Sequence, residues 1–161
     1  MLGDEGSGYQ IGLQAIKASL EEEFGYGTQT SLTPALRAFF KVEALKSLFP
    51  RINSGEMDAA AIASAAPLVF EKAAEEDGVA VRVISDAACA LRRMAATALR
   101  LSQLSACELH LWGGTFKGCF AEAIIAELRE ETDSKQITLV NQSFGNAAVI
   151  FARACHVKPH W

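Results

Sequence analysis

The chain has 161 residues, of which 50% are hydrophobic and 21% are charged. This length corresponds to one domain, and the composition supports a hydrophobic core rather than a disordered chain. The formal net charge of −4 argues against nucleic acid as the main partner, because phosphate binding needs a basic surface. No stretch reaches about 18 apolar residues, so we expect no membrane span.

The N-terminus and the cysteines favour a cytoplasmic protein. The first residues, MLGDEGSG, have neither the basic region nor the apolar run of a signal peptide. The cysteines form no CxxC pair, whereas zinc ligands usually come in close pairs. These residues are Cys89, Cys107, Cys119 and Cys155. We therefore expect reduced thiols and no metal site.

The first two thirds of the chain has the pattern of successive helices. Residues 9–24 carry apolar side chains at helical spacing, with Ser7 as a cap and Gly25 and Gly27 at the end. The acidic run 21–23 is interpreted as a solvated face of this helix. Further helices are expected at 34–41 and 42–49 (as one or two elements), 57–66, 67–74 and 79–105, with a break at 49–54 and a turn at 75–78.

The last third changes character. Residues 107–112 alternate between polar and apolar as a strand does, and 137–140 read as a short buried strand. Helices are expected at about 118–131 and at 147–154. The order strand–helix–strand–helix predicts a parallel βαβ unit with a right-handed crossover. The chain as a whole is therefore expected to be a helix-rich α/β protein.

Two segments have the composition of a binding site. In LGDEGSG, residues 2–8, glycines allow close backbone approach and Asp4 and Glu5 offer carboxylates, which accept hydrogen bonds well from sugar hydroxyls. The alternative is an ordinary acidic helix cap. In LHLWGGTFKG, residues 109–118, a strand runs into Gly113-Gly114, as at ligand sites of open α/β sheets. The alternative there is a structural tight turn, because neither a GxGxxG nor a Walker motif is present.

These segments resemble a known family. LGDEGSGYQIGLQAIKA is similar to the LGDEGSGxWIGxxAL segment of the BadF/BadG/BcrA/BcrD ATPase family, and most similar to its N-acetylglucosamine and glucosamine kinase members. The similarity continues, in order, through AIASAAPLVFEKAAEEDGVAVRVI, ELHLWGGTFKG and QITLVNQSFGNAAVIFARA, and covers roughly residues 2–154. Gln10 departs from the tryptophan usual in the first motif, and Glu76-Asp77-Gly78 replaces a Gly-Asp pair.

The resemblance implies the C-terminal RNase-H-like lobe of a two-lobed protein of the actin-like ATPase, sugar kinase and Hsp70 superfamily. Residues 1–161 would then be a single partial domain. Residues 1–106 would form its mainly helical block, 107–154 the strand–helix–strand–helix part, and 155–161 a tail. The other lobe, with its phosphate loop and catalytic base, would lie outside this chain, and LGDEGSG would be an interior loop of the whole protein.

The resemblance also implies particular site residues. Asp4 matches an aspartate that contacts the sugar, and Gly113, Gly114 and Thr115 match part of the nucleotide site, with Lys72 near the adenine. The ligands would be an amino sugar and ATP with Mg²⁺, and a homodimer is a further expectation. No catalytic residue is assigned, so we expect the isolated chain to lack kinase activity.

Two other functions stay open at this point. One is an activator ATPase of a 2-hydroxyacyl-CoA dehydratase, although no cysteine set for an iron–sulfur cluster is visible in the sequence. The other is a non-catalytic interaction module built from the helical block.

Overall fold

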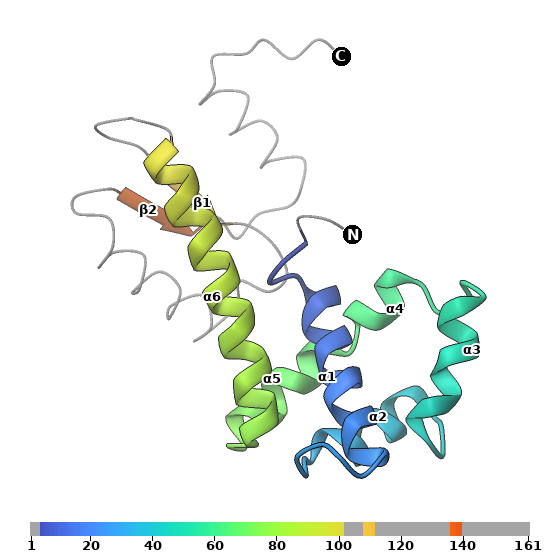
Figure 1. The fold of residues 1–161 in the computed structure, drawn as a ribbon. Coiled ribbons are helices and arrows are strands. Elements are labelled where there is room, and N and C mark those ends of the chain that lie inside the picture. Colours follow the sequence, from blue (N-terminus) through green and yellow to red (C-terminus); the bar gives the residue numbers. More distant parts are fainter. Residues whose placement is uncertain (1–3, 102–107, 112–135, 140–161) are drawn as a thin grey trace. The chain divides into compact units, whose positions relative to one another are not determined.

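The computed structural model describes residues 4–101, 108–111 and 136–139 (Figure 1). The chain divides into two compact units, residues 1–93 and 94–161. The elements of the described residues are α1 (Gly8–Glu23), α2 (Leu32–Phe40), the 3-10 helix η1 (Leu45–Ser47), α3 (Leu48–Asn53), α4 (Ala59–Ala63), α5 (Ala66–Ala74), α6 (Gly78–Leu101), β1 (Glu108–Leu111) and β2 (Gln136–Leu139). None of the helices in these ranges is long and apolar enough to cross a bilayer.

Helix α1 is the centre of the first unit, since it packs against α2, α4 and α5. Its N-terminus is capped as the sequence predicts, because the Ser7 hydroxyl accepts a hydrogen bond from the Gln10 amide at 3.2 Å. Gly25, at φ 83°, follows its C-terminus as predicted. Its buried side chains all lie on the face that the apolar spacing indicates: Ile11, Ala15, Ile16, Ser19 and Leu20.

Small residues let α1 come unusually close to α4. A Cβ atom at Gly12 would lie 2.2 Å from the carbonyl oxygen of Ile62, which is far inside van der Waals contact. Ala15, almost one turn further on, is fully buried. Only glycine fits at residue 12, so this position sets the distance between the two helices.

This close contact predicts opposite effects for two similar substitutions in α1. Gly12→Ala should lower the free energy of unfolding by about 1–3 kcal/mol, because the backbone of α4 has to move away. Gly8→Ala should be neutral or slightly stabilising, since its Cβ would lie 3.5 Å from its nearest neighbour and alanine favours helix over glycine. Urea unfolding of both variants measures the difference, and equal effects would contradict the role assigned to Gly12.

The predicted break at 49–54 is wrong, because α3 covers all of this segment except its last residue. Pro50 is the third residue of α3. The first four amides of a helix have no intrahelical partner, so a proline there removes no hydrogen bond. The α4 segment is also shorter than predicted. It begins after Asp58, whose carboxylate accepts a hydrogen bond from the Ala61 amide at 2.8 Å, and it ends at Ala63.

The acidic run at the end of α1 is not a solvated face. The Glu23 side chain is only 6% exposed and forms an ion pair with Arg37, and it accepts a hydrogen bond from the Leu45 amide at 3.0 Å. Burial by itself raises the pKa of Glu23, but the hydrogen bonds from Leu45 and Arg37 outweigh it and lower the pKa. The neighbouring Glu22 accepts a hydrogen bond from the Thr33 hydroxyl. Two of the three glutamates therefore fasten α1 to α2 and η1.

Asp77 makes the corresponding link between α2 and α6. Its carboxylate accepts hydrogen bonds from the Ser31 amide at 2.7 Å and the Thr30 hydroxyl at 2.8 Å. It also caps α6 by accepting from the amides of Val79 and Ala80, at 3.1 and 2.9 Å. Burial opposes ionisation, yet these donors lower the pKa of Asp77 from 3.8 to about 2.

The depressed pKa predicts acid-sensitive stability. A carboxyl whose folded pKa lies below its unfolded value stabilises the fold above pH ~4 and loses that contribution as the pH falls through about 2. Asp77→Ala should therefore lower the free energy of unfolding by about 1–2 kcal/mol at pH 7, and the difference from the wild type should shrink as the pH falls from about 4 through 2. Urea unfolding across this pH range tests it. Asp58→Ala, which removes a cap without a link to α2, is the control and should have the smaller effect at pH 7.

The second unit contains two strands among its described residues. β1 and β2 pair in parallel, with Glu108 opposite Gln136 and Leu111 opposite Leu139. This confirms the two predicted strands and their parallel pairing. The predicted helices at 118–131 and 147–154 lie outside the described residues, so the RNase-H-like lobe stays a prediction.

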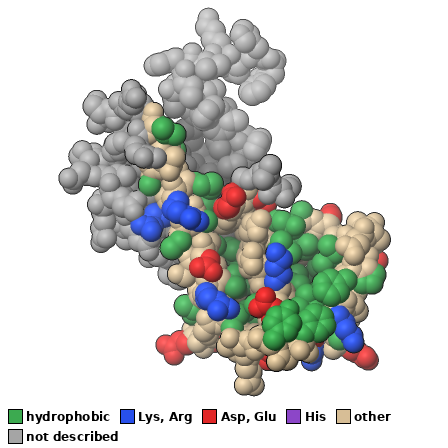
Figure 2. All heavy atoms as spheres, in the orientation of Figure 1, with side chains coloured by type: hydrophobic (Ala, Val, Ile, Leu, Met, Phe, Trp, Pro, Cys, Tyr) green, Lys and Arg blue, Asp and Glu red, His purple; other side chains and the backbone are tan. Residues whose placement is uncertain are grey.

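The surface of the first unit mixes charge with exposed aromatic rings. Figure 2 shows acidic, basic and hydrophobic side chains interspersed on the visible face. Among the described residues of this unit, five large hydrophobic residues are exposed: Phe24, Tyr26, Phe39, Phe49 and Val81. The rings of Phe24 and Tyr26 stack on each other, with their centroids 6.4 Å apart. The homodimer and the interaction module both stay predictions.

Candidate functional site

The residues that begin the predicted sugar motif form a tight turn before α1. The Ser7 amide donates a hydrogen bond to the carbonyl oxygen of Asp4 at 3.1 Å. Gly6, the third residue of the turn, has φ +77°, which is the type II conformation and requires glycine there. Because Ser7 both closes the turn and caps α1, the turn is fixed to the start of the helix.

Asp4 occupies the first position of this turn and its carboxylate is unusual. Its Oδ2 atom is buried and has no hydrogen-bond partner among the described residues. A buried carboxylate oxygen without a donor is costly, and native proteins seldom keep one without a functional reason. The Ser7 side chain performs the capping of α1, so Asp4 is not the helix cap, and its role in sugar binding stays a prediction.

The turn rests on α6 through Gly6. A Cβ atom at Gly6 would lie 2.3, 2.6 and 2.9 Å from three side-chain carbons of Leu91. The Leu91 side chain thus fills the space that any side chain at residue 6 would need. The sequence gives no sign of this contact, because the two residues are far apart in the chain.

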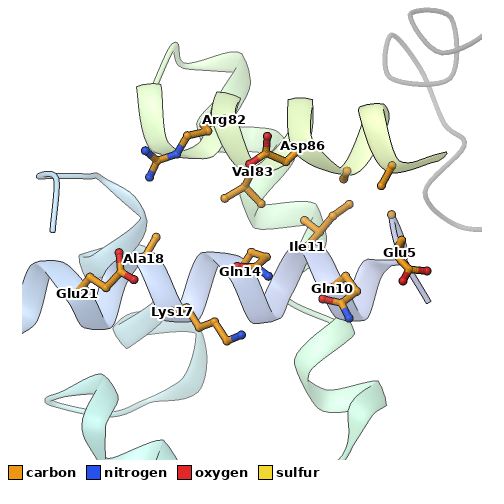
Figure 3. Close-up of a pocket in the computed structure, with 13 residues that line it drawn as sticks. Glu5, Gln10, Ile11, Gln14, Lys17, Ala18, Glu21, Arg82, Val83 and Asp86 are labelled. Atoms are coloured by element: carbon orange, nitrogen blue, oxygen red, sulfur yellow. The ribbon is translucent and has the colours of Figure 1, made fainter. Parts of the chain in front are cut away.

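A groove of about 430 Å³ runs from this turn along α1 and α6 (Figure 3). Buried apolar side chains of Ile11, Val83 and Ala87 form its floor. Charged side chains of both signs line it: Glu5, Lys17, Glu21, Arg82 and Asp86. Within the described part of the chain, none of these five makes an ion pair or a side-chain hydrogen bond. The groove thus offers donors and acceptors to a polar ligand, although Asp4 is not among the residues that line it.

The other predicted site residues are placed as follows. Gly113, Gly114 and Thr115 lie outside the described residues, so their distance from Asp4 is not defined. Lys72 lies on α5, and its ammonium group is 2.8 Å from a carboxylate oxygen of Glu75, a hydrogen bond that raises the pKa of Lys72. In the described ranges, no group of three or more His, Cys, Asp or Glu residues could hold a metal ion.

Comparison with known proteins gives one informative result. No protein-family model matches the chain, and the BadF/BadG/BcrA/BcrD resemblance stays a prediction. Over 88 residues the chain is 34% identical to the N-acetylmuramic acid/N-acetylglucosamine kinase of Clostridium acetobutylicum. The alignment covers 55% of this chain and 29% of that enzyme. The chain therefore spans less than a third of its relative, and the similarity supports a relationship to sugar kinases.

The unpartnered carboxylate of Asp4 predicts a substitution with little effect on stability. Asp4→Asn should leave the free energy of unfolding within about 0.5 kcal/mol of the wild type, or raise it, because no side-chain hydrogen bond of the described residues is lost. Ser7→Ala is the control on the same turn and should cost about 1 kcal/mol, since it removes the cap of α1. Urea unfolding compares them. A loss above about 1 kcal/mol in Asp4→Asn would assign Asp4 a structural role instead.

Proposed function

We propose that this chain is part of the C-terminal lobe of an ATP-dependent amino-sugar kinase. In the whole protein it would help transfer the γ-phosphoryl group of ATP to N-acetylglucosamine or a related hexosamine. The observation that carries the proposal is the buried, unpartnered carboxylate oxygen of Asp4 in a chain similar to an N-acetylmuramic acid/N-acetylglucosamine kinase.

The chemistry of Asp4 suits a sugar hydroxyl. A carboxylate accepts hydrogen bonds at both oxygens, and hydrogen bonds to a charged acceptor are stronger than those between neutral groups. A sugar hydroxyl that donates to this carboxylate would supply the kind of partner that the described residues do not give Oδ2. Asp4 would bind and orient the sugar in this way, and we assign it no part in proton transfer.

The nucleotide side of the proposal rests on the resemblance. Gly113, Gly114 and Thr115 would contact ATP at the end of β1, within an RNase-H-like lobe of a cytoplasmic protein. Mg²⁺ would accompany ATP and neutralise charge on the phosphates, while a carboxylate takes the proton of the sugar hydroxyl. The phosphate loops and that carboxylate are proposed to come from parts of the whole protein that this chain does not contain.

Sugar binding by the chain tests the proposed role of Asp4. Titration calorimetry with N-acetylglucosamine, N-acetylmuramic acid and glucosamine should detect binding of at least one. Asp4→Ala should weaken that binding by about 10- to 100-fold, the range for losing hydrogen bonds to a charged group. Glu43→Ala is the control, because it removes an exposed carboxylate that lies outside the turn and the groove and should change the affinity little. Equal losses in the two variants would refute a specific role for Asp4.

Catalysis by the isolated chain is expected to be absent. A coupled ATPase assay with N-acetylglucosamine should show no turnover above background, because no catalytic base or phosphate loop is assigned within these residues. Robust turnover would overturn this expectation. Binding of neither sugar nor ATP would instead favour the interaction module, and an iron–sulfur absorbance band after anaerobic purification would favour the activator ATPase.

A further inference from the structure

We propose that Leu91 of α6 is a positioning residue for Asp4, which it holds in a binding conformation through Gly6 without touching the ligand. The inference rests on the proposed function in one respect, namely that Asp4 binds a sugar. Leu91 lies in neither of the two segments whose composition indicates a binding site. Its role follows from where its side chain lies.

The turn is held at three points in the described structure. Two are local: the Ser7 amide binds the Asp4 carbonyl at 3.1 Å, and the Ser7 hydroxyl binds the Gln10 amide at 3.2 Å. Both involve Ser7. With these two hydrogen bonds alone, residues 4–6 could still rotate as one unit about the start of α1. The third is the contact of the Leu91 side chain with the backbone at Gly6.

Leu91 is therefore a contact that restrains this pivot. Residue 6 has no side chain, and the Leu91 carbons lie within 2.3–2.9 Å of where its Cβ would be, so they lie against the turn. The carboxylate of Asp4 is two residues away on the same turn. A binding group that is already oriented loses less conformational freedom when the ligand arrives, and affinity is higher for that reason.

The first test needs no sugar. Amide hydrogen exchange of Ser7, whose amide closes the turn, should be about tenfold faster in Leu91→Ala, because the turn opens more often. Leu91→Met, which conserves volume, should restore the wild-type rate. Met94→Ala truncates a nearby side chain of α6 that is 43% exposed and should leave the rate unchanged. If Leu91→Ala unfolds, Leu91→Val, a smaller truncation, replaces it.

The second test uses calorimetry with the amino sugar that the wild type binds. Leu91→Ala should weaken affinity about three- to tenfold, since the segment must then be ordered on binding, and Leu91→Met should restore it. Unchanged Ser7 exchange in Leu91→Ala would overturn the inference, whatever the sugar result. Faster exchange with unchanged affinity would overturn it as well. A wild type that binds no amino sugar would refute the proposed function, while the exchange measurement would still decide whether Leu91 holds the turn.

Discussion

The contact between Gly12 and the carbonyl of Ile62 is the constraint on which the helical unit depends. At this point two backbones meet with no side chain between them, so the position of α1 relative to α4 has almost no freedom. Ser7 closes the turn before α1 and also caps the helix, so the position of α1 fixes the position of the turn. The candidate site thus sits at the end of a helix whose placement is set by packing, whereas loops that carry functional groups are often mobile.

Two carboxylates also connect the helices of this unit. Glu23 joins α1 to α2 and η1, and Asp77 joins the start of α2 to the start of α6. Both have lowered pKa values, because several donors converge on each. The mild acidity of the chain is therefore partly a requirement of the fold. Asp4 is the contrasting case, since its buried oxygen lacks the donors that these two have among the described residues.

Local signals in the sequence were sufficient for much of the secondary structure of the described residues. The cap at Ser7, the end of α1 at Gly25 and the alternation in β1 involve neighbouring residues, and each was predicted. The break at Pro50 was wrong because a proline is equally compatible with the first turn of a helix. Glu23 was misread because its partner Arg37 is 14 positions away, and no local pattern encodes that pairing. Leu91 could not be predicted at all, since only the folded chain brings it to Gly6.

The contact between Gly6 and Leu91 limits how the LGDEGSG motif can be reused. The seven residues bring their own turn and their own helix cap, but the surface beneath Gly6 comes from a helix that starts 70 residues later. A graft of the motif onto another protein would reproduce the sequence and leave the turn unsupported. Any designed transplant of this segment therefore has to include a helix that presents a branched aliphatic side chain to the glycine, and a search for such motifs should require that pair of positions.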